Sequence, residues 1–185
     1  MDFIEKHARV HLNRELNEIE TSNRKLELPE LSVYEKAIIY KYSNDGYDSI
    51  NEKLRISEGK ETIELGKLLR RVINKLPNYV GLVYRGANLT NIEISRYEKA
   101  LKLNSGIKEF SFLSCTHSRL IAMAFRGNVF FRIFSKTGKS VDKVTKFGFH
   151  GNSNEKEVII VPNRNFNVLE VVYASDYTTI TMEEI

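Results

Sequence analysis

The hydrophobic pattern changes at Pro77, and this change restricts the possible folds more than any other feature of the chain. Before Pro77, apolar residues recur about every 3.6 residues, as in amphipathic helices, most regularly over residues 62–76. After Pro77, short apolar runs alternate with turn residues, a pattern typical of strands. A helical first half followed by a mainly stranded second half predicts an α+β fold.

The chain of 185 residues is long enough to bury a proper core. We expect a single domain over residues 1–185, with a helical extension over residues 1–31. Capping boxes mark two helix starts, Ser32 with Glu35 and Thr90 with Glu93. Other expected helices cover residues 3–19, 47–55, 62–76 and 118–125, and residues 43–46 are expected to end the helix that starts at Ser32. Expected strands cover residues 79–84, 110–114, 129–134, 158–161, 166–174 and 177–182, with a turn at 136–139 and polar loops at 102–108 and 142–154.

The chain carries no sequence signal for a membrane or for secretion. No apolar run approaches the roughly 20 residues that span a bilayer. The charged, amphipathic N-terminus is not a secretory signal. A single cysteine, Cys115, excludes an internal disulfide and fits a reducing compartment. We expect a protein of the cytoplasm, or one delivered into a target cell.

Charge is unevenly distributed along the chain. Residues 1–70 carry 12 basic and 14 acidic side chains (net −2), and residues 71–185 carry 16 basic and 10 acidic (net +6). Such a field suits a phosphate-bearing ligand, either a dinucleotide or a nucleic acid. A solvated basic face is the alternative, and charge does not choose between them.

Two acidic residues, Glu155 and Glu157, precede the apolar strand at residues 158–161. In an extended chain residues i and i+2 face the same side, so the two carboxylates are expected to project together and raise each other's pKa. Such a pair can stabilise a cationic sugar or take a proton from a nucleophile. A solvated strand entrance, with Lys156 between two surface acids, is the alternative on these residues alone.

Three polar motifs lie at the mouths of three separate predicted strands: Tyr84-Arg85-Gly86, Phe112-Leu113-Ser114-Cys115-Thr116 and Glu155-Lys156-Glu157. In this order and spacing they resemble the arginine–serine–glutamate class of mono-ADP-ribosyltransferases, which includes clostridial and other bacterial exoenzymes. The resemblance covers about residues 33–182. It includes residues 47–55, 114–125 and 166–168.

The resemblance implies helices packed on two antiparallel sheets that flank an NAD cleft. Arg85 would bind diphosphate or ribose oxygens, and Gly86 would let NAD approach the main chain. Phe125 would stack on nicotinamide, with a place in the core as the alternative. Arg126 is also expected to contact NAD, although several relatives place this arginine three residues after the phenylalanine, where Asn128 stands.

Cleavage of the nicotinamide–ribose bond builds positive charge on the ribose. The resemblance implies that Glu157 stabilises this cation, that Ser114 holds Glu157 in position and that Thr116 supports the site. The family usually has Ser-Thr-Ser here, and we expect Cys115, in place of the central Thr, to face the core. In the family, Glu rather than Gln at Glu155 goes with arginine as the acceptor.

Target recognition is expected from two places. The loop over residues 146–153 leads into Glu155, and its best candidate for a target contact is Phe149; packing into the sheet is the alternative. Tyr42 and Tyr47 lie where relatives of this family meet their targets.

The predicted function is transfer of ADP-ribose from NAD to an arginine of a target protein, with release of nicotinamide. The alternatives are an NAD glycohydrolase, in which water takes the ribose, and a non-catalytic module that binds NAD or nucleic acid. NAD is expected as a substrate, without a metal and without a membrane. His7 and His11 have a metal-compatible spacing, but no third ligand accompanies them.

Overall fold

The computed structural model describes residues 2–185, and the chain divides into two compact units. We call Met1–Pro77 with Lys139–Glu157 the helical unit, and Asn78–Gly138 with Val158–Ile185 the sheet unit. The chain therefore enters the sheet unit twice, and the segment that precedes Glu157 belongs to the helical unit.

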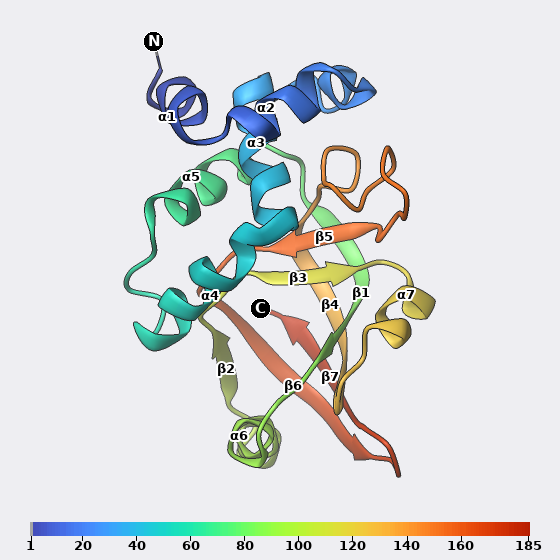
Figure 1. Cartoon of the computed structure of the whole chain (residues 1–185). Helices are drawn as coiled ribbons and strands as arrows, with labels where there is room; N and C mark the ends of the chain where they lie inside the picture. Colours follow the sequence, from blue (N-terminus) through green and yellow to red (C-terminus); the bar gives the residue numbers. More distant parts are fainter. Residues whose placement is uncertain (1) are drawn as a thin grey trace. The chain divides into compact units, whose positions relative to one another are not determined.

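Helices of the N-terminal half make up most of the helical unit (Figure 1). They are α1 (Phe3–His11), α2 (Asn13–Glu20), the 3₁₀ turn η1 (Asn23–Leu26), α3 (Val33–Lys41), the π-helical turn η2 (Tyr42–Gly46), α4 (Tyr47–Ile56) and α5 (Glu64–Ile73). The single helix predicted over residues 3–19 is two helices, because Leu12 leaves the helical conformation with φ −126° and ψ 34°. Leu12 nevertheless stays buried, so both short helices keep an apolar side.

Helix α3 is the centre of the helical unit. Its predicted capping box is confirmed, since Ser32 Oγ accepts from the Glu35 N–H and the Glu35 carboxylate accepts from the Ser32 N–H. Three consecutive residues, Ala37, Ile38 and Ile39, are fully buried, so the helix is enclosed on several sides. It packs on α1, α2 and α5.

Residues 43–46 do not end the helical path, and that prediction is wrong. They lie in η2, which joins α3 directly to α4. The turn is tight, since a Cβ on Gly46 would lie 3.1 Å from the carbonyl oxygen of Lys41. Glycine avoids this close contact inside the π turn, a turn type that is frequent at functional sites.

The strands form one connected sheet rather than the two antiparallel sheets that were predicted. They are β1 (Tyr79–Ala87), β2 (Gly106–Glu109), β3 (Leu113–Thr116), β4 (Val129–Ser140), β5 (Glu157–Ile160), β6 (Arg164–Tyr173) and β7 (Thr178–Glu184). The strand order is β1-β3-β5-β4-β7-β6-β2. A further pairing between β1 and β4 joins the strands β1, β3, β5 and β4 into a closed ring. The first half of the long strand β4 pairs with β1 and also, in parallel, with β7, which links the two groups of strands.

Two polar stretches that were predicted as a loop and a turn belong to strands. Residues 106–108, expected in a loop, belong to β2, which pairs with β6. Residues 136–139, expected as a turn, continue β4 to Ser140. The buried carboxylate of Glu184 explains the second case, because it accepts hydrogen bonds from the N–H groups of Lys136 and Thr137 at 2.7 and 2.9 Å.

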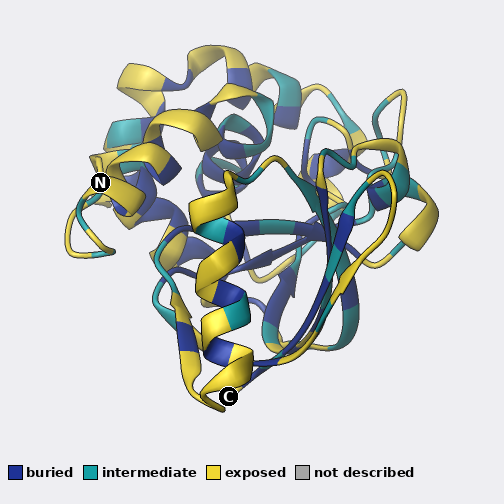
Figure 2. Ribbon diagram, turned by 90° about the horizontal axis from the view of Figure 1, so that it is seen from below, coloured by how far each residue is buried: buried dark blue, intermediate teal, exposed yellow. Residues whose placement is uncertain are grey.

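The core of the sheet unit lies between the sheet and helix α6 (Asn91–Lys102), which opens with the predicted Thr90–Glu93 capping box. Ile94, Tyr97 and Ala100 recur every three residues and form the buried side of α6. Figure 2 shows this burial: buried residues (dark blue) run along the strands, and the helices carry both buried and exposed (yellow) residues. Over residues 2–185, no helix has the length and apolar character of a membrane span.

Candidate active site

Arg85 and Ser114 are held together in the sheet unit by antiparallel strands. Arg85 lies on β1 and Ser114 on β3, and Tyr84 of β1 pairs with Thr116 of β3. The Arg85 guanidinium donates from Nη1 to the carbonyl oxygen of Ser114 at 2.7 Å. A guanidinium has five N–H donors in a rigid plane. This hydrogen bond fixes the orientation of that plane, whose remaining N–H groups suit the oxygens of an anion.

The residues after Ser114 support this arrangement. Cys115 is buried, as predicted. Thr116 is buried too, and its Oγ1 accepts from the Ser118 N–H at 3.0 Å. Thr116 therefore ends β3 and shapes the turn into helix α7 (Arg119–Ala124).

Close contact with the backbone of Phe125 and Arg126 requires a glycine at position 86. A Cβ at this position would lie 2.5 Å from the carbonyl oxygen of Phe125 and 2.6 Å from Cα of Arg126. The backbone at the end of α7 thus passes directly over β1, next to Arg85. Close packing against this backbone therefore accounts for a glycine at position 86.

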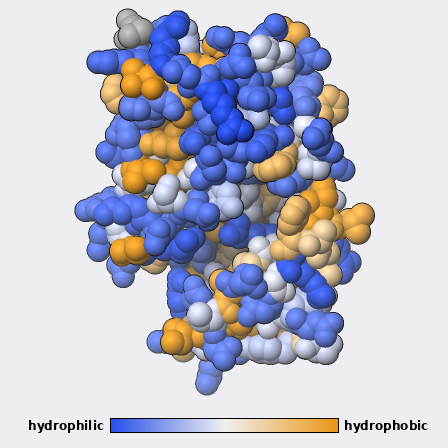
Figure 3. Space-filling view, in the orientation of Figure 1, coloured by the Kyte–Doolittle hydropathy of each residue, from blue (hydrophilic) through white to orange (hydrophobic). Residues whose placement is uncertain are grey.

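Phe125 is 65% exposed at the end of α7, so it does not occupy the core. Figure 3 shows hydrophobic side chains gathered over α7. Arg126 lies with its guanidinium carbon 4.3 Å from the centre of the Tyr177 ring. The Asn128 side chain binds the backbone of Leu89, because it donates to Leu89 O at 2.8 Å and accepts from the Leu89 N–H at 2.9 Å.

Glu155 and Glu157 have different surroundings in the helical unit. Glu157 is 5% exposed and begins β5, and its carbonyl accepts from the Val141 N–H at 3.0 Å. Glu155 precedes the strand, and its N–H donates to Phe147 O at 2.8 Å. Lys156 between them has φ +51°, and its N–H donates to Asn154 Oδ1 at 2.8 Å.

The expected strand geometry of this pair is therefore wrong. A left-handed residue between two glutamates breaks the pleat that would place i and i+2 on one face. Burial raises the pKa of Glu155, whereas mutual repulsion with Glu157 was the predicted cause. Glu155 thus keeps its proton to a higher pH than an exposed carboxylate.

The three residues predicted to meet a target differ in accessibility. Tyr42 is fully buried, and its hydroxyl accepts from the side-chain amide of Asn51 at 3.3 Å, so the prediction of a direct target contact is wrong for it. Tyr47 and Phe149 are 44% and 64% exposed, so their side chains are accessible.

No family model matches the chain, but individual proteins do. Over 151 residues the chain is 28% identical to Tre1 of Serratia proteamaculans, named an NAD(+)–protein-arginine ADP-ribosyltransferase; the match covers 80% of the chain and 31% of Tre1. The solved ADP-ribosyltransferase HopU1 of Pseudomonas syringae has a TM-score of 0.78 at 19% identity, over 94% of the chain and 87% of HopU1. Exoenzyme S of Pseudomonas aeruginosa, solved with human 14-3-3 protein beta and carba-NAD, has a TM-score of 0.76 at 15% identity, over 98% of the chain and 86% of exoenzyme S.

The chain is thus similar in sequence and in fold to mono-ADP-ribosyltransferases. It spans less than a third of the length of Tre1, so the relative contains much that this chain does not match. The α+β fold that was predicted is the ADP-ribosyltransferase fold.

The sequence did not single out a buried polar pair that lies close enough to Arg85 to be affected by its charge. Tyr97 of α6 donates from Oη to Glu109 Oε1 at 2.8 Å. Burial raises the pKa of Glu109, an effect that the positive charges of Arg96 and Arg85 partly oppose. Residues 99–146 contain ten Lys or Arg and only two acidic residues, Glu109 and Asp142. This isolation of Glu109 is the sequence signal that could have identified it.

Among the described residues, no group of three or more His, Cys, Asp or Glu side chains is arranged to hold a metal ion. The rings of His7 and His11 lie 4.8 Å apart. Burial and the neighbouring His11 lower the pKa of His7.

Proposed function

We propose that this protein cleaves NAD and transfers ADP-ribose to an arginine side chain of a target protein. Residues 1–185 would act as one catalytic domain, with residues 1–31 as its N-terminal extension, and would work inside a target cell. The name of Tre1, an arginine-modifying enzyme, supports this choice of acceptor.

The observation that carries the proposal lies in the sheet unit. Gly86 brings the backbone of Phe125 against β1, so a fixed guanidinium and an exposed aromatic ring emerge from adjoining residues. A dinucleotide offers a diphosphate for the first and a flat nicotinamide ring for the second. Ser114, Thr116 and Arg126 complete the proposed NAD-binding surface.

The reaction breaks the bond between ribose C1′ and the nicotinamide nitrogen, and the bonding electrons leave with nicotinamide. Positive charge then develops on the ribose. We assign its stabilisation to Glu157, whose burial strengthens the interaction of a carboxylate with a cation. Ser114 is assigned a supporting role.

The acceptor step forms a bond between an arginine Nη and C1′ and releases one proton from the guanidinium. We assign orientation of that guanidinium, and acceptance of the proton, to Glu155. Its pKa, raised by burial, brings it closer to the range useful for a general base.

The test uses purified protein, NAD and agmatine, a small arginine mimic, with products identified by mass. ADP-ribosylated agmatine is the expected product. Free ADP-ribose alone would indicate a glycohydrolase, and NAD binding without any cleavage would indicate a non-catalytic module. Arg85→Lys serves as a companion variant, because lysine lacks the planar fork and should bind NAD more weakly.

A further inference from the structure

Glu155 depends for its position on a loop of the helical unit, residues 142–154, which contains neither helix nor strand. The loop folds back on itself, since the Phe149 N–H donates to Asp142 O at 2.8 Å. It then holds Glu155 directly, because Phe147 O accepts from the Glu155 N–H at 2.8 Å. Any movement of Lys146 and Phe147 therefore moves the backbone of Glu155.

Arg24 of η1 binds this loop from a point far away in the sequence. It is only 6% exposed, and its guanidinium donates from Nε to Thr145 O at 3.2 Å and from Nη2 to Lys146 O at 3.3 Å. The same cation lies 5.3 Å from the centre of the Tyr40 ring. A buried guanidinium that binds two consecutive carbonyls fixes both position and direction of the chain there.

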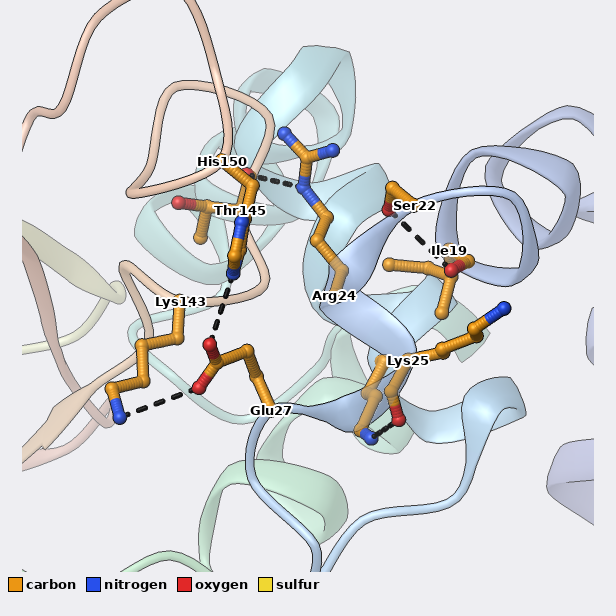
Figure 4. A network of polar contacts seen from close by, with 9 residues as sticks. Ile19, Ser22, Arg24, Lys25, Glu27, Lys143, Thr145 and His150 are labelled. Carbon is orange, nitrogen blue, oxygen red and sulfur yellow. Dashed lines mark hydrogen bonds and ion pairs between the residues drawn. The ribbon is translucent and has the colours of Figure 1, made fainter.

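Glu27 binds the loop on either side of the Arg24 contact. Its carboxylate lies 3.0 Å from His150 Nε2 and 3.3 Å from Lys143 Nζ. Figure 4 shows Arg24 and Glu27 directed at the same loop, with dashed contacts to Thr145, His150 and Lys143. The hydrogen bond from His150, followed by the contact with Lys143, lowers the pKa of Glu27, which favours its charged form.

The π turn η2 holds Lys146 independently of Arg24. Ser43 Oγ accepts from the Lys146 N–H at 3.1 Å, and Asn44 Oδ1 accepts from Lys146 Nζ at 2.5 Å. Lys146 is thus bound through its N–H, its carbonyl and its side chain. The residue next to it provides the carbonyl that binds Glu155.

We infer that Arg24 and Glu27 are positioning residues for the acceptor step, which they serve by fixing the 142–154 loop and, through Phe147, Glu155. The inference rests on the proposed function. It gives the N-terminal extension a role in the choice between transfer to arginine and loss of ADP-ribose to water.

The test compares Arg24→Ala and Glu27→Gln with wild type, with Arg14→Ala as a matched control on the exposed surface of α2. Agmatine modification and NAD hydrolysis are measured side by side. We expect transfer to fall about tenfold in Arg24→Ala through a higher KM for agmatine, while hydrolysis stays within about twofold. Arg24→Lys should recover part of the transfer, and Arg14→Ala should match wild type.

Hydrogen exchange of the Glu155 amide supplies a readout that is independent of activity. Loss of the Arg24 contact should speed exchange over residues 142–157 in Arg24→Ala and leave α5 unchanged. An unchanged ratio of transfer to hydrolysis, or an equal loss of both, would overturn the inference. If Arg24→Ala does not fold, Glu27→Gln decides in the same assays. A wild-type protein that modifies no agmatine would contradict the proposed function, while faster Glu155 exchange in the variant would still support the positioning contact.

Discussion

Arg85 and Glu155 are fixed in different ways, although both are assigned to one reaction. Arg85 lies on a strand, bound to a backbone carbonyl of the neighbouring strand, and the backbone of Phe125 packs directly over Gly86. Glu155 follows a loop without regular structure, and a buried side chain from η1 and partly buried side chains from η2 hold that loop.

The difference shows which of the proposed functional residues can change position without loss of the fold. Three of the residues proposed to bind NAD, Arg85, Ser114 and Thr116, lie on the paired strands β1 and β3, and strand pairing tolerates little local movement. Side-chain contacts to a loop can be altered one at a time. We therefore expect NAD cleavage to depend on the sheet, and the choice of acceptor to depend on the loop.

The largest expected effect is that of Glu157→Gln. The amide keeps the size of the side chain but cannot stabilise a cation by charge. Nicotinamide release should fall by about 10²–10³-fold, with little change in the melting temperature. Activity near that of wild type would show that Glu157 is not the stabilising group.

The next effect is on the pH dependence of transfer. Because burial raises the pKa of Glu155, its charged form is lost at a higher pH than for an exposed glutamate. Below that pKa, transfer to agmatine should fall about tenfold per pH unit, while hydrolysis without agmatine persists to lower pH. The comparison would fail if the two rates had the same pH profile.

Gly86→Ala tests the rigid side of the comparison. The new methyl group would meet the backbone of Phe125 at 2.5 Å, so Phe125 must shift. We expect KM for NAD to rise several-fold and stability to fall by about 1–3 kcal/mol. Gly106→Ala is the matched control, since a Cβ there has its nearest neighbours at 3.7 Å. An unchanged KM for NAD in Gly86→Ala would show that Phe125 does not contribute to NAD binding.

The smallest effect is expected for Phe149→Ala. The ring is largely exposed, so its removal should leave the melting temperature and agmatine modification unchanged. Modification of a protein target should fall a few-fold, as expected for a rim contact at an interface. Equal losses with agmatine and with protein would place Phe149 in the catalytic step.

Local signals predicted much of this fold. Both capping boxes, Ser32 with Glu35 and Thr90 with Glu93, are where the sequence placed them, because each needs only residues three apart. Most strands were found within a few residues. The buried orientation of Cys115 followed from simple alternation along β3.

Features that depend on tertiary contacts were missed. The polar residues 136–139 continue a strand only because Glu184 binds their N–H groups, and that glutamate is far away in sequence. Nothing local shows that Lys156 takes a left-handed conformation or that Tyr42 is enclosed. The contact between Arg24 and Thr145 joins residues 121 apart, so no periodicity or motif could reveal it.

The most direct test of this division of labour is the fate of ADP-ribose in Glu155→Gln. Nicotinamide, free ADP-ribose and ADP-ribosylated agmatine are measured in one reaction, for wild type and for the variant. The account predicts that the variant releases nicotinamide at nearly the wild-type rate without agmatine, but sends ADP-ribose to water rather than to agmatine. A parallel loss of both products would show that Glu155 serves NAD cleavage itself, and that its role is not confined to the acceptor step.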